Sequence, residues 1–155
     1  MKSLHCCFPL QELSWYVPPM QLQNPTLRSP KSRRCLAEMG AAANARDVER
    51  HVGFYAHDDW VVFIFNGEPT IGWQAIRDKQ REVWRNGASD VVYTMQGKPT
   101  FLVAARGVVV TTIFLKSRRT MPNGQVADGK FAISSLWQKR PEGWRVIYSH
   151  ESTTR

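Results

Sequence analysis

Apolar residues recur at helical spacing in the first part of the chain and alternate with polar residues in the last part. Between residues 32 and 45, apolar positions three or four apart predict a helix with Ser32 as its N-cap. Residues 48–55 predict a second, short helix that begins after Asp47, and residues 73–84 predict a third. Asn86-Gly87 then provides a left-handed stop for that third helix.

Strand patterns appear at residue 60 and dominate from residue 90 onward. The run from Trp60 to Phe65 is β-branched and aromatic, and Asn66-Gly67 ends it with turn residues. Five alternating segments follow, with glycine-containing turns between them. They span about 90–95, 100–105, 107–117, 130–138 and 144–152. This order predicts an α+β fold: a cone-shaped α+β barrel, in which three N-terminal helices pack in a curved, mostly antiparallel sheet around an apolar pocket.

The chain divides into an arm and one domain. Its 155 residues, 43% of them hydrophobic, are enough for a single buried core. Residues 1–30 are rich in Pro and Gln and have no sustained periodicity, which predicts an extended or mobile N-terminal arm. Residues 31–155 are expected to form the single domain.

Composition narrows the classes of function. Half of the formal net charge of +8 lies before residue 36, and the remaining charges are interleaved, so we do not expect nucleic-acid binding. The three cysteines are clustered near the start without metal-ligand spacing, so we expect no metal site, free thiols and a cytoplasmic location. No apolar run reaches the ~18–20 residues of a membrane span, so no membrane association is expected.

Two segments resemble the nuclear transport factor 2-like superfamily, which includes ketosteroid isomerases and SnoaL-type polyketide cyclases. One is Tyr55-Ala56-His57-Asp58-Asp59 with the strand and the Gly67-Glu68-Pro69-Thr70-Ile71-Gly72 turn that follow it. The other is the closing stretch 137–152, which looks like the final hairpin of that superfamily, with a Gly143-Trp144-Arg145 turn and a His150-Glu151-Ser152 end. The resemblance implies a SnoaL-like domain that forms a homodimer through its sheet and needs no cofactor.

The same resemblance argues against ketosteroid isomerase chemistry. Aligned without gaps, the general-base aspartate of those isomerases falls at Phe63, and their oxyanion-hole tyrosine falls at Met39. Their protonated aspartate falls near Ser135. None of these three side chains can take over the corresponding task.

Strand alternation, continued from these matches, predicts which side chains face the pocket. The expected catalytic residues are His150 for proton transfer, Asp59 to orient it, and Tyr148 or Ser135 to donate to an oxyanion. The expected ligand-binding residues are Met39, Tyr55, Val61, Phe63, Ser135, Trp137 and Ser152. An alternative reading places His150 at the pocket mouth or at a dimer interface.

Two functions remain open. The first is binding of a small hydrophobic molecule in an enclosed pocket, with or without cofactor-free acid/base catalysis of the cyclase, dehydratase, isomerase or epoxide hydrolase type. The second is a non-catalytic ligand-binding or dimerisation and assembly module. Contact between Asp59 and His150 inside a closed cavity would favour the enzyme; separation or exposure to water would favour the module.

Overall fold

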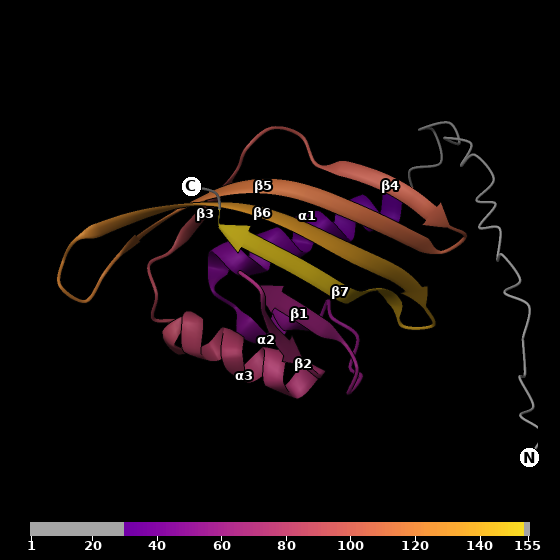
Figure 1. Cartoon of the computed structure of the whole chain (residues 1–155), viewed down its shortest axis with the longest axis horizontal. Helices are drawn as coiled ribbons and strands as arrows, with labels where there is room; N and C mark the ends of the chain where they lie inside the picture. Colours follow the sequence, from indigo (N-terminus) through magenta and orange to yellow (C-terminus); the bar gives the residue numbers. More distant parts are fainter. Residues whose placement is uncertain (1–29, 154–155) are drawn as a thin grey trace, which may run out of the picture.

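The computed structural model describes residues 30–153 (Figure 1). The predicted arm, residues 1–29 of it, lies outside the described residues. The three expected helices are α1 (Pro30–Ala45), α2 (Val48–Val52) and α3 (Trp73–Val83), and a short 3-10 turn, η2 (Arg85–Gly87), follows. The strands are β1 (Val62–Phe65), β2 (Glu68–Ile71), β3 (Val92–Met95), β4 (Thr100–Ala105), β5 (Val108–Thr120), β6 (Val126–Arg140) and β7 (Gly143–Thr153).

All seven strands belong to one curved sheet that arches over the helices (Figure 1). The strand order is β2-β1-β7-β6-β5-β3, with β4 also paired to β5. Every pairing is antiparallel except that of β1 with β7. The sheet remains open, since β2 forms one edge and β3 and β4 together form the other. The prediction of a cone-shaped α+β fold with a mostly antiparallel sheet is thus confirmed.

Two parts of the sheet differ from the sequence prediction. Residues 68–71, read as a turn, form the edge strand β2, which tolerates Pro69 because it pairs on one side only. Strand β6 begins at Val126 and runs through Asp128-Gly129, so it is longer than the predicted segment 130–138. A Cβ on Gly129 would lie 2.8 Å from the Ser117 hydroxyl, so this glycine makes room for a neighbour within the strand.

A β-bulge in β7 decides which of its side chains face the helices. Trp137 of β6 pairs with Val146, but the preceding residue of β6, Leu136, pairs with Tyr148, which leaves Ile147 as the extra residue. Alternation therefore restarts at the bulge. Val146 and Ser149 are both buried on the inner face of the sheet, whereas Tyr148 lies on the outer face.

The side chain of Asn44 protects the open edge of the sheet at β3. Its Nδ2 donates to the Tyr93 carbonyl over 3.0 Å, and its Oδ1 accepts the Tyr93 backbone N–H over 2.7 Å. One amide side chain at the end of α1 thus replaces a neighbouring strand. Unpaired edges invite pairing with other chains, so this contact also guards against aggregation.

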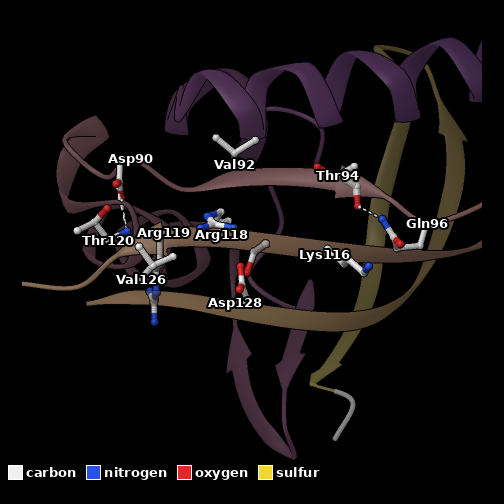
Figure 2. A pocket seen from close by; sticks show the side chains of 11 residues that line it. Asp90, Val92, Thr94, Gln96, Lys116, Arg118, Arg119, Thr120, Val126 and Asp128 are labelled. Carbon is white, nitrogen blue, oxygen red and sulfur yellow. Dashed lines mark hydrogen bonds between the residues drawn. The ribbon is translucent and has the colours of Figure 1, made fainter. Parts of the chain in front are cut away.

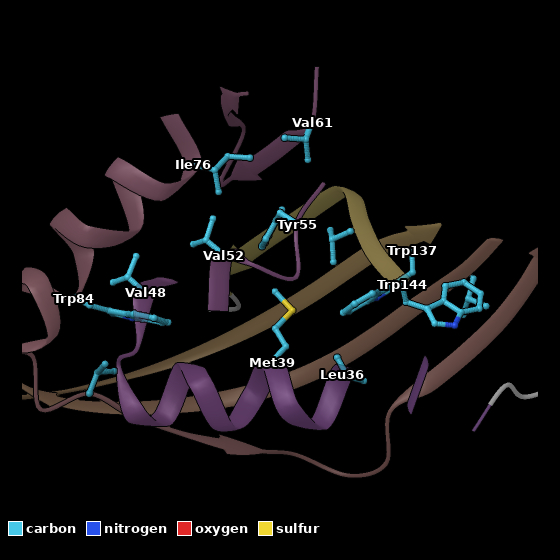
Figure 3. Packing of buried hydrophobic residues seen from close by; sticks show 13 residues of the cluster. Leu36, Met39, Val48, Val52, Tyr55, Val61, Ile76, Trp84, Trp137 and Trp144 are labelled. Atoms are coloured by element: carbon cyan, nitrogen blue, oxygen red, sulfur yellow. The ribbon is translucent and has the colours of Figure 1, made fainter. Parts of the chain in front are cut away.

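The core fills the space between the helices and the inner face, where β6 and β7 meet α1 and α2 (Figure 3). Two of its three indoles donate a hydrogen bond inside the core. Trp137 Nε1 donates to the Thr111 hydroxyl and Trp84 Nε1 to the Tyr93 hydroxyl, each over 3.0 Å. None of the helices in residues 30–153 is long and apolar enough to cross a membrane.

A hollow of about 620 Å³ lies at the far end of the sheet, where β3, β5 and β6 run past the end of β7 (Figure 2). Val92, Arg118 and Asp128 line it and are register partners across the three strands. They alternate with Tyr93 and Ser117, which face the interior. The hollow is therefore a groove of the outer face, separate from the core.

Replacing Asn44 by Ala should expose the edge at β3. We expect faster hydrogen exchange of the Tyr93 amide and a loss of about 0.5–1.5 kcal/mol in the free energy of unfolding. Asn44→Asp keeps an acceptor for that N–H and should retain most of its protection. Equal exchange rates in wild type and Asn44→Ala, measured by NMR, would contradict this role.

Candidate functional site

Three hydroxyl groups are connected on the inner face near the middle of the sheet. Ser135 of β6 and Ser149 of β7 are buried register partners, and their Oγ atoms are 2.9 Å apart. Tyr55, also buried, shares a hydrogen bond with Ser149. The backbone around Tyr55 runs beside Val146 as a parallel bridge, which holds the tyrosine against β7.

Glu151 lies two residues beyond Ser149, on the same inner face of β7. Its cross-strand partners are Phe65 and Ile133, so its surroundings are apolar. Within residues 30–153 its carboxylate takes part in no ion pair. Burial raises the pKa of Glu151 to about 7, which leaves it able to give or take a proton near neutrality.

The Glu151 carboxylate contributes to raising the pKa values of two tyrosines. Burial raises the pKa of Tyr55, the hydrogen bond with Ser149 opposes that rise, and Glu151 adds to it. Burial likewise raises the pKa of Tyr93, against the Trp84 hydrogen bond and with a contribution from Glu151. Both phenols therefore stay protonated and can donate hydrogen bonds.

His51 of α2 lies near Tyr55 and Trp84 on the helix side of the core. Its ring meets Trp84 edge-on at a centroid distance of 5.0 Å, and its Nδ1 lies 3.2 Å from the Met39 carbonyl. Burial lowers the pKa of His51 to about 4, so the ring is neutral and Nδ1–H donates to that carbonyl. This histidine is a packing element with one satisfied nitrogen.

Of the residues predicted to bind ligand, those that precede β7 in the chain do lie on the inner side (Figure 3). Met39, Tyr55, Val61, Ser135 and Trp137 are buried, and Phe63 is partly buried against the core. Most of them also belong to the hydrophobic core, so their packing role is clear. Ligand contact by these side chains stays a prediction.

The orientation predicted for the end of β7 is wrong. His150 is exposed, Tyr148 is 39% exposed, and Ser152 alternates with the inward Glu151, so all three belong to the outer face. Asp59 is exposed in the turn before β1, and no hydrogen bond joins it to His150 in the described part of the chain. The acid–base role predicted for His150 thus lacks the enclosed position on which it depended.

Sequence reasoning missed Ser149 and Glu151 because it continued a period of two through the bulge. One signal was available. Val146 and Ile147 are adjacent apolar residues in a strand whose other positions alternate, and such a pair can mark a change of face. Residues 30–153 hold no cluster of three side chains able to ligate a metal.

Known structures share this architecture. A nuclear transport factor 2-like superfamily protein from Salmonella enterica matches with a TM-score of 0.69 and 17% identity, over 79% of this chain and 87% of its own. A ketosteroid isomerase-like protein from Erwinia carotovora matches at 0.65 and 16%, over 79% and 93%. A putative calcium/calmodulin dependent protein kinase II association domain from Xanthomonas campestris matches at 0.66 and 16%, over 84% and 91%.

At these identities the likeness concerns the fold alone. No protein-family profile matches the sequence, and no curated protein matches it either.

Glu151→Gln should change how stability depends on pH. The ordinary pKa of this carboxyl is 4.5 and its folded pKa is about 7. The unfolded chain therefore loses the proton first, so the contribution of Glu151 to stability falls as pH rises from about 4.5 to about 7. Glutamine cannot ionise, so the variant should gain about 3 kcal/mol relative to wild type over that interval.

Urea denaturation at a series of pH values measures this difference, because the other titrating groups cancel between the two proteins. Glu142→Gln, in the exposed β6–β7 turn, is the matched control and should follow the wild-type curve. Parallel curves for wild type and Glu151→Gln would show that Glu151 titrates normally.

Proposed function

We propose that this chain, which has the nuclear transport factor 2-like fold, binds a small hydrophobic molecule against the inner face of its sheet and exchanges a proton with it through Glu151. One observation carries the proposal. A carboxyl group with a pKa of about 7 lies on an apolar inner face without an ion pair among the described residues. Burying such a group costs stability, and groups of this kind concentrate at functional sites.

The neighbouring hydroxyls supply complementary chemistry. Tyr55 and Tyr93 are protonated donors within the electrostatic range of Glu151, and Ser149 links Tyr55 to Ser135. A ligand with a carbonyl or hydroxyl group could accept from a phenol while Glu151 removes or returns a proton. Cofactor-free isomerisation, dehydration, cyclisation or epoxide opening needs groups of this kind.

The inner face around Glu151 suits an apolar ligand. Phe63, Tyr93 and Ile113 are only partly buried although they pack against the core. Their uncovered surface supports a binding area for a hydrophobic body, and the polar groups would orient it.

A second candidate is assembly of two copies through the outer face. Phe114 is 51% exposed and Tyr148 39%, and Leu136 lies between β5 and β7 on that same face. Large exposed apolar residues grouped on one surface are typical of interfaces. The exposure of Asp59 and His150 also favours this role, and His150 would then contact the partner copy.

Native mass spectrometry tests the first function. We expect an added mass on the freshly purified protein that is lost on denaturation. Once identified, that compound should bind with an affinity that changes between about pH 5.5 and 8.5, as Glu151 ionises, and Glu151→Gln should abolish the pH dependence. Calorimetry at several pH values measures both effects.

His150→Ala is the matched control, since it alters the neighbouring residue on the opposite face. It should leave affinity and its pH dependence unchanged. The proposal fails if His150→Ala removes the pH dependence and Glu151→Gln does not, or if no hydrophobic compound binds.

Phe114→Glu tests the second candidate, because a charge in the middle of an apolar interface disfavours association. We expect a dimer for wild type and a monomer for this variant by light scattering coupled to gel filtration. Val83→Glu, which places the same charge on an exposed apolar position of α3, should remain a dimer. A monomeric wild type would exclude this role.

A further inference from the structure

The groove at the far end of the sheet combines apolar walls with basic groups. Val92 of β3 and Val126 of β6 line it and are each about half exposed, at 51% and 52%. Lys116 and Arg118 of β5 line it from the strand between them (Figure 2). Two residues apart on one face of a strand, these cations begin about 7 Å from each other.

These two cations have no partner of opposite charge within the described residues. Asp128 is the register partner of Arg118, yet no ion pair in residues 30–153 includes either of them or Lys116. Asp90, the other acid of the groove, is already engaged. Its two oxygens accept the Thr120 backbone N–H at 3.0 and 3.1 Å, and the Thr120 hydrogen bonds hold the pKa of Asp90 below its ordinary value.

The volume of the groove is also suitable for a small molecule. About 620 Å³ lies within the range of small-molecule sites, and such sites combine an apolar lining with a few polar anchors. Arg119 also borders the groove, but strand alternation turns its side chain toward the opposite face, so Lys116 and Arg118 are the cations that face a ligand.

We propose that this groove binds an organic anion, with its phosphate or carboxylate on Lys116 and Arg118 and a short apolar body on Val92 and Val126. Arginine and lysine are the side chains that most often hold such groups, and a partly enclosed groove strengthens the attraction. The site is independent of Glu151, because the two lie on opposite faces of the sheet.

Phenyl phosphate is a suitable probe, and benzyl alcohol is its uncharged counterpart. In a titration followed by ¹H–¹⁵N NMR, we expect phenyl phosphate to shift the amides of Thr94, of residues 116–120 and of Asp128, and benzyl alcohol to shift none. The double variant Lys116→Gln/Arg118→Gln should bind at least about tenfold more weakly. Asp128→Asn should bind severalfold more tightly, since it removes a negative neighbour.

The matched control is Lys98→Gln/Arg106→Gln, which removes two exposed charges from turns outside the groove. It should bind like wild type, and so should Glu151→Gln. Two results would overturn the proposal: no saturable shifts with phenyl phosphate, or equal weakening by the control and by Lys116→Gln/Arg118→Gln, which would mean attraction to net charge alone.

Discussion

Strand β7 contains one more residue than the stretch of β6 with which it pairs, and the bulge at Ile147 absorbs the difference. Before the bulge, Trp144 and Val146 face the helices and complete the core. After it, Ser149 and Glu151 take that direction. Without the extra residue, Glu151 would lie in water and Tyr148 would have to fit inside the cone. The polar composition of the inner face therefore depends on one backbone irregularity.

The protein places an ionisable group where ionisation is unfavourable, and the surrounding packing must offset the cost. Trp84, Trp137 and Val146 are almost fully buried beside the polar cluster, and the indole N–H groups are satisfied. A rigid, well-bonded frame of this kind limits the access of water to the partly buried Glu151. The same frame fixes Tyr55 and Tyr93, so their hydroxyls need little reorganisation to meet a ligand.

Local sequence patterns predicted the helices and most of the strands, but they did not predict in every strand which side chains face the interior. Helical spacing around Met39 and Ile76 and the Asn66-Gly67 turn predicted α1, α3 and the end of β1, because these features depend on neighbouring residues. Inward placement was also predictable for Val61, just before β1, and for Ser135 and Trp137 of β6, because the extra residue of the bulge belongs to β7.

The remaining features depend on partners distant in sequence. The bulge at Ile147 is defined by pairing with β6, strand β2 by pairing with β1, and the continuation of β6 through Gly129 by its fit against Ser117. The uncharged, polar character of Ser149 gave no sign that it would pair with Ser135 and support Tyr55. Burial of Glu151 could be recognised only after the register was known.

The two faces of the sheet carry different chemical groups. Because alternate residues point to opposite sides, His150 and Glu151 are covalent neighbours in different environments: His150 is exposed on the outer face, and Glu151 is partly buried beside Phe65 and Ile133 on the inner face. Changes on the outer face can therefore alter assembly or the groove at Arg118 without touching the inner carboxyl. A fold built in this way can acquire a ligand site and an interface independently, which is why the arrangement of side chains, and not the fold alone, must decide the function.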